Sequence, residues 1–374
     1  QRGLARILLA SGDRPAAIDA YRGILNVEPD NAGDRVTLAE IYAVTDLGKA
    51  IAELKKVIDR DLHHAPAYRL LASFYNRAGD TIRANRVLSA LTLLGFSEES
   101  DGSTSQQLRA VRAPAVVQQA LSADMRSQYL LMPASKSIVG QVFDALAEPI
   151  ATRFATATIG SRLVALRLQD EFNFSPTLTE LCATMKVAPE VFIGERVPGM
   201  MAAMAFPRPM VVLDRSFADE TPEVQRFILG YGLEAIRGGY AFLLTLGSRQ
   251  RRELTALLKS ILSAPESRSS IAMELVAGLP PAAQHFIENN YHLVRDGDVA
   301  TWLDSALAVA KRGGLLACDD YAAAIWAVAR LAGETPSSHD ETIALGAVLG
   351  GPDLLRFYIS DDYQRLRDVL AVPA

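Results

Sequence analysis

The chain has 374 residues, of which 49% are apolar and 22% are charged, and its formal net charge is −5. This length suits two or three domains with cores of their own, and the composition is that of a globular protein. The slight negative charge argues against a nucleic acid or an anionic membrane surface as partner. Two cysteines, Cys182 and Cys318, lie far apart in the sequence, which predicts free thiols in a reducing compartment.

Nothing in the sequence predicts insertion into a membrane. The longest apolar stretch, 197–213, is interrupted by three prolines and an arginine, and it falls short of the ~20 residues that a spanning helix needs. We therefore expect a cytoplasmic location. The chain begins with Gln1 instead of methionine, which indicates a fragment, so this expectation leaves room for a missing targeting segment.

The first 96 residues contain an internal period of 33 to 34 residues. The Leu-Ala pair that marks each period occurs at Leu4-Ala5, Leu38-Ala39 and Leu71-Ala72. Tyr42 and Tyr75 each follow the leucine of their period by four residues, and Gly-Asp pairs at 12–13 and 79–80 predict the turns. Such a period is typical of stacked helical hairpins, which bury their apolar faces only against one another.

These 96 residues resemble the tetratricopeptide repeat, most closely over 12–31, where the order Gly-Asp-Arg-Pro-Ala-Ala and a later Pro-Asp-Asn follow the repeat pattern. The resemblance implies about three repeats in a helical-hairpin solenoid, whose groove takes a protein or peptide. The polar residues that it places in this groove are Arg6, Glu40, Arg69, Ser73 and Asn76. The alternative is that the array only supports the next domain and its groove stays empty.

The segment 97–135 is predicted to be a linker with a connecting helix. Residues 97–107 are rich in Ser, Glu, Asp and Gly and have little to bury, whereas 108–132 returns to a helical pattern. A second domain, 136–374, is expected to follow. Apolar residues on one face predict helix over most of 134–170, and a Ser-Pro start signal predicts another over 177–186.

A small sheet is predicted next, from short apolar runs at 191–195, 200–206 and 210–213 that turn residues separate. A helix begins after Thr221, which is followed by proline and an early acid. The remainder, to about Val372, has helical patterns with Gly and Pro breaks. The fold class is therefore mainly α, a repeat solenoid followed by a mostly helical α+β domain with one small sheet.

The strands and the helix after Thr221 resemble the core of the HtpX-type zinc metallopeptidases of peptidase family M48, which implies a zincin-like core over about 180–330. In that family the helix carries His-Glu-x-x-His, in which two histidines on one helix face bind zinc and the glutamate is the general base. Leu229-Gly230 matches the start of the motif, but the residues after it are Tyr231, Gly232, Leu233, Glu234 and Ala235.

A second segment also resembles the family and also lacks the zinc ligand that the family has there. The family has its third ligand, a glutamate, just before an Ala-Asp-Arg-Ala-Gly-Leu-Leu-like stretch, which resembles 310–316 here. The glutamate position then falls on Leu307 and the aspartate position on Lys311. The vestigial positions Tyr231, Gly232, Ala235 and Leu307 offer at most one phenol, so we expect no catalytic residue, no bound metal and no cofactor. Tyr231, Ala235, Tyr240 and Leu307 would line the emptied pocket, and the sequence leaves open whether it is filled core or a site for something else; a core role is the preferred interpretation of Tyr231.

Other residues suggest little chemistry. His285 and His292 are seven apart on an expected helix and share a face, but no third ligand is near, and a surface pair is the preferred interpretation. His339 lies between serines and an aspartate, yet a catalytic triad is assembled in space and not along five residues. Asp319 and Asp320 are interpreted as a helix N-cap instead of a carboxylate pair.

The resemblances lead to two functional hypotheses. The first is a non-catalytic interaction or scaffold protein, whose repeats recruit a partner and whose pseudopeptidase domain is a platform or a second binding surface. The alternative is that the vestigial pocket binds a peptide or small ligand, or that it hydrolyses a substrate with an unrecognised site. One bound zinc ion per chain in the purified protein would contradict the first hypothesis. The identity of the partner and the oligomeric state are not predicted by the sequence.

Overall fold

A computed structural model describes residues 1–96, 120–154, 164–166 and 172–370, and it separates into two compact units, Gln1–Pro114 and Ala115–Ala374. The described residues are mostly helical with one small sheet, which confirms the predicted mainly α class. Within the described ranges, no helix combines the length and apolar character that crossing a membrane demands.

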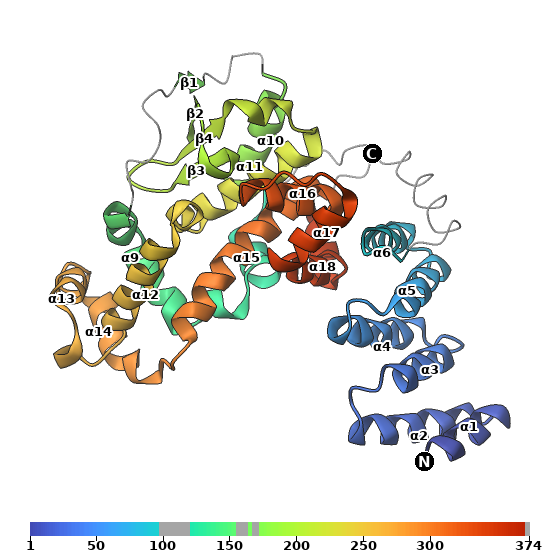
Figure 1. The fold of residues 1–374 in the computed structure, drawn as a ribbon. Helices are drawn as coiled ribbons and strands as arrows, with labels where there is room; N and C mark the ends of the chain where they lie inside the picture. The colour runs from blue at the N-terminus through green and yellow to red at the C-terminus, as the bar shows by residue number, and fades with distance from the viewer. Residues whose placement is uncertain (97–119, 155–163, 167–171, 371–374) are drawn as a thin grey trace. The chain divides into compact units, whose positions relative to one another are not determined.

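The first unit is a row of helices, each packed against the next along the chain (Figure 1). They are α1 (Arg2–Ala10), α2 (Arg14–Val27), α3 (Ala32–Tyr42), α4 (Leu47–Arg60), α5 (Ala65–Arg77) and α6 (Thr81–Leu93). Asp13, Asp46 and Asp80 each accept a hydrogen bond from the backbone three residues on, which caps α2, α4 and α6. Ala17 and Ala50 are fully buried in the second helix of their pairs, where a larger side chain would push the neighbours apart.

The sheet lies at one end of the second unit, and most of the helices extend away from it (Figure 1). The α-helices are α8 (Ala123–Met125), α9 (Ile138–Phe154), α10 (Ser175–Met185), α11 (Pro222–Arg237), α12 (Ser248–Ile261), α13 (Ser270–Ala277), α14 (Pro281–Asn290), α15 (Asp298–Cys318), α16 (Tyr321–Leu331), α17 (His339–Val348), α18 (Gly351–Tyr358) and α19 (Asp361–Leu370). Short 3₁₀ or π turns are η1 (Arg126–Leu130), η2 (Pro133–Lys136), η3 (Pro198–Met200), η4 (Arg215–Asp219), η5 (Ala241–Thr245), η6 (Pro265–Ser267) and η7 (Tyr291–Leu293).

The sheet has the strand order β1-β2-β4-β3. Its strands are β1 (Val164–Leu166), β2 (Glu190–Gly194), β3 (Met201–Met204) and β4 (Met210–Asp214). β2 pairs with β4 in parallel, and the other two pairings are antiparallel. The three predicted strands are confirmed. β1 was not predicted, because it falls inside the stretch 134–170 that was expected to be helical; within that stretch, helix is described only in η2 and α9.

The second unit begins before the boundary predicted at residue 136. Residues 97–107 and the first part of 108–132 lie outside the described residues. The Leu121 N–H donates to the Thr184 carbonyl at 2.8 Å, and Arg126 pairs with Glu234 on α11. The end of the predicted linker is therefore built into the fold of the second unit.

Candidate functional site

Of the four positions that the resemblance assigns to lost zinc chemistry, Tyr231, Gly232 and Ala235 lie on α11 and Leu307 lies on α15. The hydroxyl of Thr221 caps the N-terminus of α11 and Pro222 occupies the first turn, as predicted. Nearly every residue from Val224 to Ile236 is buried, because α11 packs against β3, α10, α15 and α16. A helix buried on all sides is a core element. A ligand-binding site on α11 would therefore have to take the place of side chains of the hydrophobic core.

Tyr231, at the first histidine position, is a buried core aromatic. Its ring stacks on Phe227, with a centroid separation of 6.4 Å and an interplanar angle of 12°. Burial raises the pKa of the Tyr231 phenol above its ordinary value, and the nearby Arg251 only partly opposes this. The phenol is therefore neutral at physiological pH, which makes it a poor ligand for zinc.

Gly232, at the position of the general base, faces the edge strand of the sheet. A Cβ atom there would lie 2.5 Å from Sδ and 2.8 Å from Cε of Met201 on β3. These separations are far inside van der Waals contact. Met201 is itself buried. Its side chain therefore occupies the volume into which a glutamate at position 232 would project.

Ala235, at the second histidine position, is fully buried, whereas Leu307 on α15 is half-buried. α11 and α15 form a close helix pair through small residues: a Cβ on Gly230 would lie 2.5 Å from that of Ala317 and 2.9 Å from the Gly313 carbonyl oxygen. Gly313 is six residues beyond Leu307, less than two helical turns. The structure thus places Tyr231, Gly232 and Ala235 on one helix and Leu307 on its closest helical neighbour.

Lys311, which the resemblance places at the aspartate position of the family, is a half-buried cation on α15. Its Nζ donates to the Leu349 carbonyl oxygen at 2.5 Å. Burial lowers the pKa of Lys311, while Asp353 raises it and Arg251 lowers it further. The charge of Arg251 lowers the pKa of both Tyr231 and Lys311.

Glu234 is the residue whose importance the sequence did not reveal. It was placed off the ligand face as an ordinary intervening position, yet its side chain is fully buried. Its Oε1 accepts from Arg126 Nη2 at 2.6 Å and from Nε at 2.7 Å. Glu234 is the single charged residue of the stretch 227–236, and this is the signal that marks it, because buried carboxylates require a partner.

Three polar atoms around Glu234 have no hydrogen-bond partner among the described residues: Glu234 Oε2, Arg237 Nη1 and the Tyr240 hydroxyl. The Tyr240 hydroxyl lies close enough to Glu234 and Arg126 to affect the pKa of both. Burial raises the pKa of the Glu234 carboxyl and Arg126 opposes this, while burial also raises that of Tyr240. The group is a buried polar cluster that draws its cation, Arg126, from the segment before residue 136.

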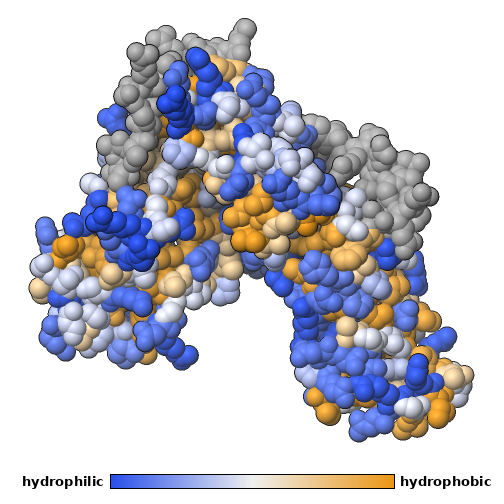
Figure 2. All heavy atoms as spheres, in the orientation of Figure 1, coloured by the Kyte–Doolittle hydropathy of each residue, from blue (hydrophilic) through white to orange (hydrophobic). Residues whose placement is uncertain are grey.

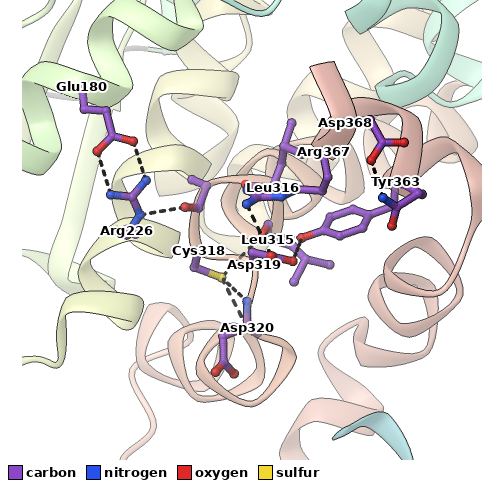
Figure 3. Close-up of polar contacts among 12 residues, drawn as sticks. Glu180, Arg226, Leu315, Leu316, Cys318, Asp319, Asp320, Tyr363, Arg367 and Asp368 are labelled. Carbon is purple, nitrogen blue, oxygen red and sulfur yellow. Dashed lines mark hydrogen bonds and ion pairs between the residues drawn. The ribbon is translucent and has the colours of Figure 1, made fainter. Parts of the chain in front are cut away.

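A separate polar network holds the C-terminal end of α15 (Figure 3). Arg226 forms a two-pronged ion pair with Glu180 and donates to the Ala317 carbonyl oxygen at 2.9 Å. Arg367 donates to the Leu316 carbonyl oxygen, and the Tyr363 hydroxyl to Asp319 Oδ1 at 2.8 Å. Cations and donors at the last carbonyls of a helix stabilise its terminus. The role of this network is structural, because it supplies hydrogen-bond donors to the last carbonyl oxygens of α15 and connects α10, α11 and α19 to that helix.

The remaining sequence predictions have mixed outcomes. Asp320 caps α16 by accepting from the Ala323 N–H, as predicted, but Asp319 ends α15 in a left-handed conformation. His285 and His292 do not share a helix face, because α14 ends at Asn290. Both cysteines are free. In the described part of the chain, no group of three or more His, Cys, Asp or Glu side chains is arranged to hold a metal ion.

The predicted groove residues lie on the first helices of the repeat pairs. Arg6, Glu40, Ser73 and Asn76 are exposed on α1, α3 and α5. Arg69 is half-buried and donates to the Phe96 carbonyl oxygen at 2.7 Å, so its guanidinium is already engaged within the first unit.

Comparisons of the chain with protein-family models, with curated proteins and with solved structures find no match. The function is therefore inferred from the residues of the two units themselves.

Proposed function

We propose that this chain is a non-catalytic interaction protein, in which a tetratricopeptide-type solenoid recruits a protein or peptide and a degenerate HtpX-like domain serves as a rigid platform. The zincin-like core would have kept the helix and strands of a peptidase and exchanged its metal chemistry for packing. The observation that carries this proposal is the chemistry of the buried residues at the positions the resemblance assigns to the two histidines: Tyr231 offers only a phenol stacked on Phe227, and Ala235 offers no ligand atom.

The packing around α11 supports the non-catalytic assignment. A catalytic zinc needs three protein ligands and an open water position. The corresponding positions carry a phenol stacked on Phe227, a fully buried alanine and a leucine. Restoring a single ligand would not recreate the site, because the surrounding volume is occupied by the core.

The test for the second unit is its zinc content. We expect the purified full chain, incubated with equimolar zinc and dialysed, to retain well below one zinc per chain by inductively coupled plasma mass spectrometry. A His285→Ala/His292→Ala variant is the control for adventitious surface binding. Stoichiometric zinc that persists in this variant, or proteolysis of a peptide library that a chelator abolishes, would overturn the proposal.

The test for the first unit is loss of a partner on changing the groove. We expect Ser73→Glu/Asn76→Glu in the full chain to lose proteins that the unaltered chain captures from a lysate of its source, because added carboxylates disfavour a docked peptide by desolvation and repulsion. Both positions are exposed on α5, so the fold is unaffected. Glu288→Lys, an exposed charge change in the second unit, is the control. Equal capture by the three proteins would refute the groove assignment.

A further inference from the structure

The amine of Lys311 on α15 is held by a single hydrogen bond. The residue is half-buried, and its Nζ donates to the carbonyl oxygen of Leu349, the C-cap residue of α17. Among the described residues, no carboxylate forms an ion pair with this amine. A lysine that is drawn into a fold is usually paired with an acid, so Lys311 is an unusual cation.

The acids around Lys311 do not pair with it directly. Both carboxylate oxygens of Asp353 on α18 accept from Arg312, at 2.8 Å from Nη2 and at 3.1 Å from Nε. Asp304, about two turns earlier on α15, acts on Lys311 only through its charge. Arg251 on α12 adds the charge of a second cation. The amine therefore lies in a cluster of charged groups without a direct acidic partner.

The protonation of the amine follows from this cluster. Burial lowers the pKa of Lys311, Asp353 raises it, Arg251 lowers it and Asp304 raises it, with a net shift downward. At a given pH, a larger fraction of this amine is therefore neutral than in an ordinary lysine. Desolvation and a neighbouring cation are the conditions that turn a lysine amine into a nucleophile.

The amine lies beneath a turn at the surface of the second unit. A Cβ atom on Gly350, which separates α17 from α18, would lie 3.0 Å from Lys311 Nζ, and the next two nearest atoms belong to the same lysine side chain. Val348, two residues earlier, is 84% exposed, and apolar side chains are visible on the surface where α17 and α18 lie (Figure 2). Because position 350 has no side chain, this turn leaves Nζ within reach of a small molecule.

We propose that Lys311 is a nucleophilic amine and the site at which a small acyl phosphate acylates this chain. The lone pair of the neutral amine attacks the acyl carbon, and a C–N bond forms. The C–O bond to the phosphate breaks, the phosphate leaves with the electron pair of that bond, and the proton of the amine passes to water. The charge of Arg251 favours the approach of an anionic acyl donor. This inference holds whether or not the groove of the first unit binds a partner.

Acylation would change the C-terminal end of α17. The ammonium of Lys311 lies at the Leu349 carbonyl oxygen, and a cation at the C-terminus of a helix stabilises that terminus. An amide at Nζ is neutral and loses this attraction. The modification therefore weakens the contact between α15 and the turn that joins α17 to α18.

The probe is acetyl phosphate, incubated with the purified full chain at neutral pH. Peptide mass spectrometry measures the initial rate of acetylation at each lysine, and Lys259, an exposed lysine on α12 in the same unit, is the internal reference. We expect Lys311 to be acetylated at least about threefold faster than Lys259, because more of its amine is neutral. The rate at Lys311 is expected to level off below ~pH 10.4, the ordinary pKa of a lysine.

Two variants on α12 test the role of the charge cluster. Arg251→Met is expected to slow acetylation of Lys311 at least about twofold, because it removes a charge that lowers the pKa of Lys311. Arg252→Met, at the next exposed position, removes a charge that does not act on Lys311 and should leave the rate unchanged. Circular dichroism and the rate at Lys259 check that both variants are folded. The proposal is overturned if Lys311 reacts no faster than Lys259, or if the two variants have the same effect.

Discussion

Replacing Arg126 with methionine is expected to lower the free energy of unfolding of the second unit by about 3–5 kcal/mol, the usual cost of removing one partner of a buried ion pair. Methionine retains much of the apolar volume of the arginine stem, so the loss reports the missing charge. The Glu234 carboxylate would remain fully buried with its principal cation gone. Urea unfolding followed by hydrogen-exchange mass spectrometry measures the effect, because peptides from the two units are read separately.

The pH dependence of this loss identifies Glu234 as its source. Burial holds the pKa of Glu234 above its ordinary value, and removal of Arg126 raises it further. A carboxyl whose folded-state pKa is raised binds its proton more tightly when folded, so its contribution to stability is present at low pH and is lost as the pH rises towards the folded pKa. The destabilisation by Arg126→Met is therefore expected to be smaller at acidic than at alkaline pH.

Two further variants test this assignment. Arg249→Met removes a largely exposed ion pair with Glu253 on α12 and is expected to cost less than about 1 kcal/mol. Glu234→Gln in the Arg126→Met background removes the unpaired charge and is expected to recover part of the stability. Equal losses for Arg126→Met and Arg249→Met, or no dependence on pH, would show that Glu234 is not an important buried charge.

A second large loss of stability is expected from a substitution at the place where α11 and α15 cross. Gly230→Ala should destabilise the second unit by about 1–3 kcal/mol, although alanine is the better helix former. The added methyl group would lie 2.5 Å from the Ala317 Cβ and 2.9 Å from the Gly313 carbonyl oxygen. Relief requires the two helices to separate, which disturbs the densest packing of the unit.

Gly23→Ala on α2 is the matched control, because the same methyl group there meets nothing within 4 Å. At this exposed helical position the substitution is expected to stabilise the first unit by about 0.5–1 kcal/mol. The change in the free energy of unfolding is therefore expected to have opposite signs in the two units. This difference, measured by the same hydrogen-exchange experiment, separates the effect of packing from that of helix propensity. Stabilisation by both substitutions would contradict the close approach of α11 and α15.

The interpretation of α11 also changes with the structure. The sequence left open whether the region of Tyr231, Ala235, Tyr240 and Leu307 is filled core or a binding site. In the structure, Tyr231 stacks on Phe227 and the side chain of Met201 lies against Gly232. The polar atoms without partners lie one residue away from Ala235, on Glu234, and at Arg237 and Tyr240. The buried polarity of this region is therefore centred on the ion pair of Arg126 and Glu234 and not on Tyr231, Gly232 or Ala235.

The sequence by itself determined the features that depend on residues close together in the chain. Asp13, Thr221 and Asp320 start helices because each hydroxyl or carboxylate reaches a backbone N–H only three residues on. Short apolar runs bounded by turn residues were enough to predict β2, β3 and β4, and the spacing of Leu4, Leu38 and Leu71 predicted the helical row of the first unit.

Only the tertiary structure decided which distant residues meet. Arg126 and Glu234 are 108 positions apart, and Met201 reaches Gly232 from another element of the fold. The physical reason is that a cap or a periodic pattern is satisfied by local geometry, whereas a buried charge or a filled volume is satisfied by any neighbour that packing brings near. The local patterns of the sequence therefore predicted α11 and its neighbouring strands, and only the packing showed which side chains surround Tyr231, Gly232 and Ala235.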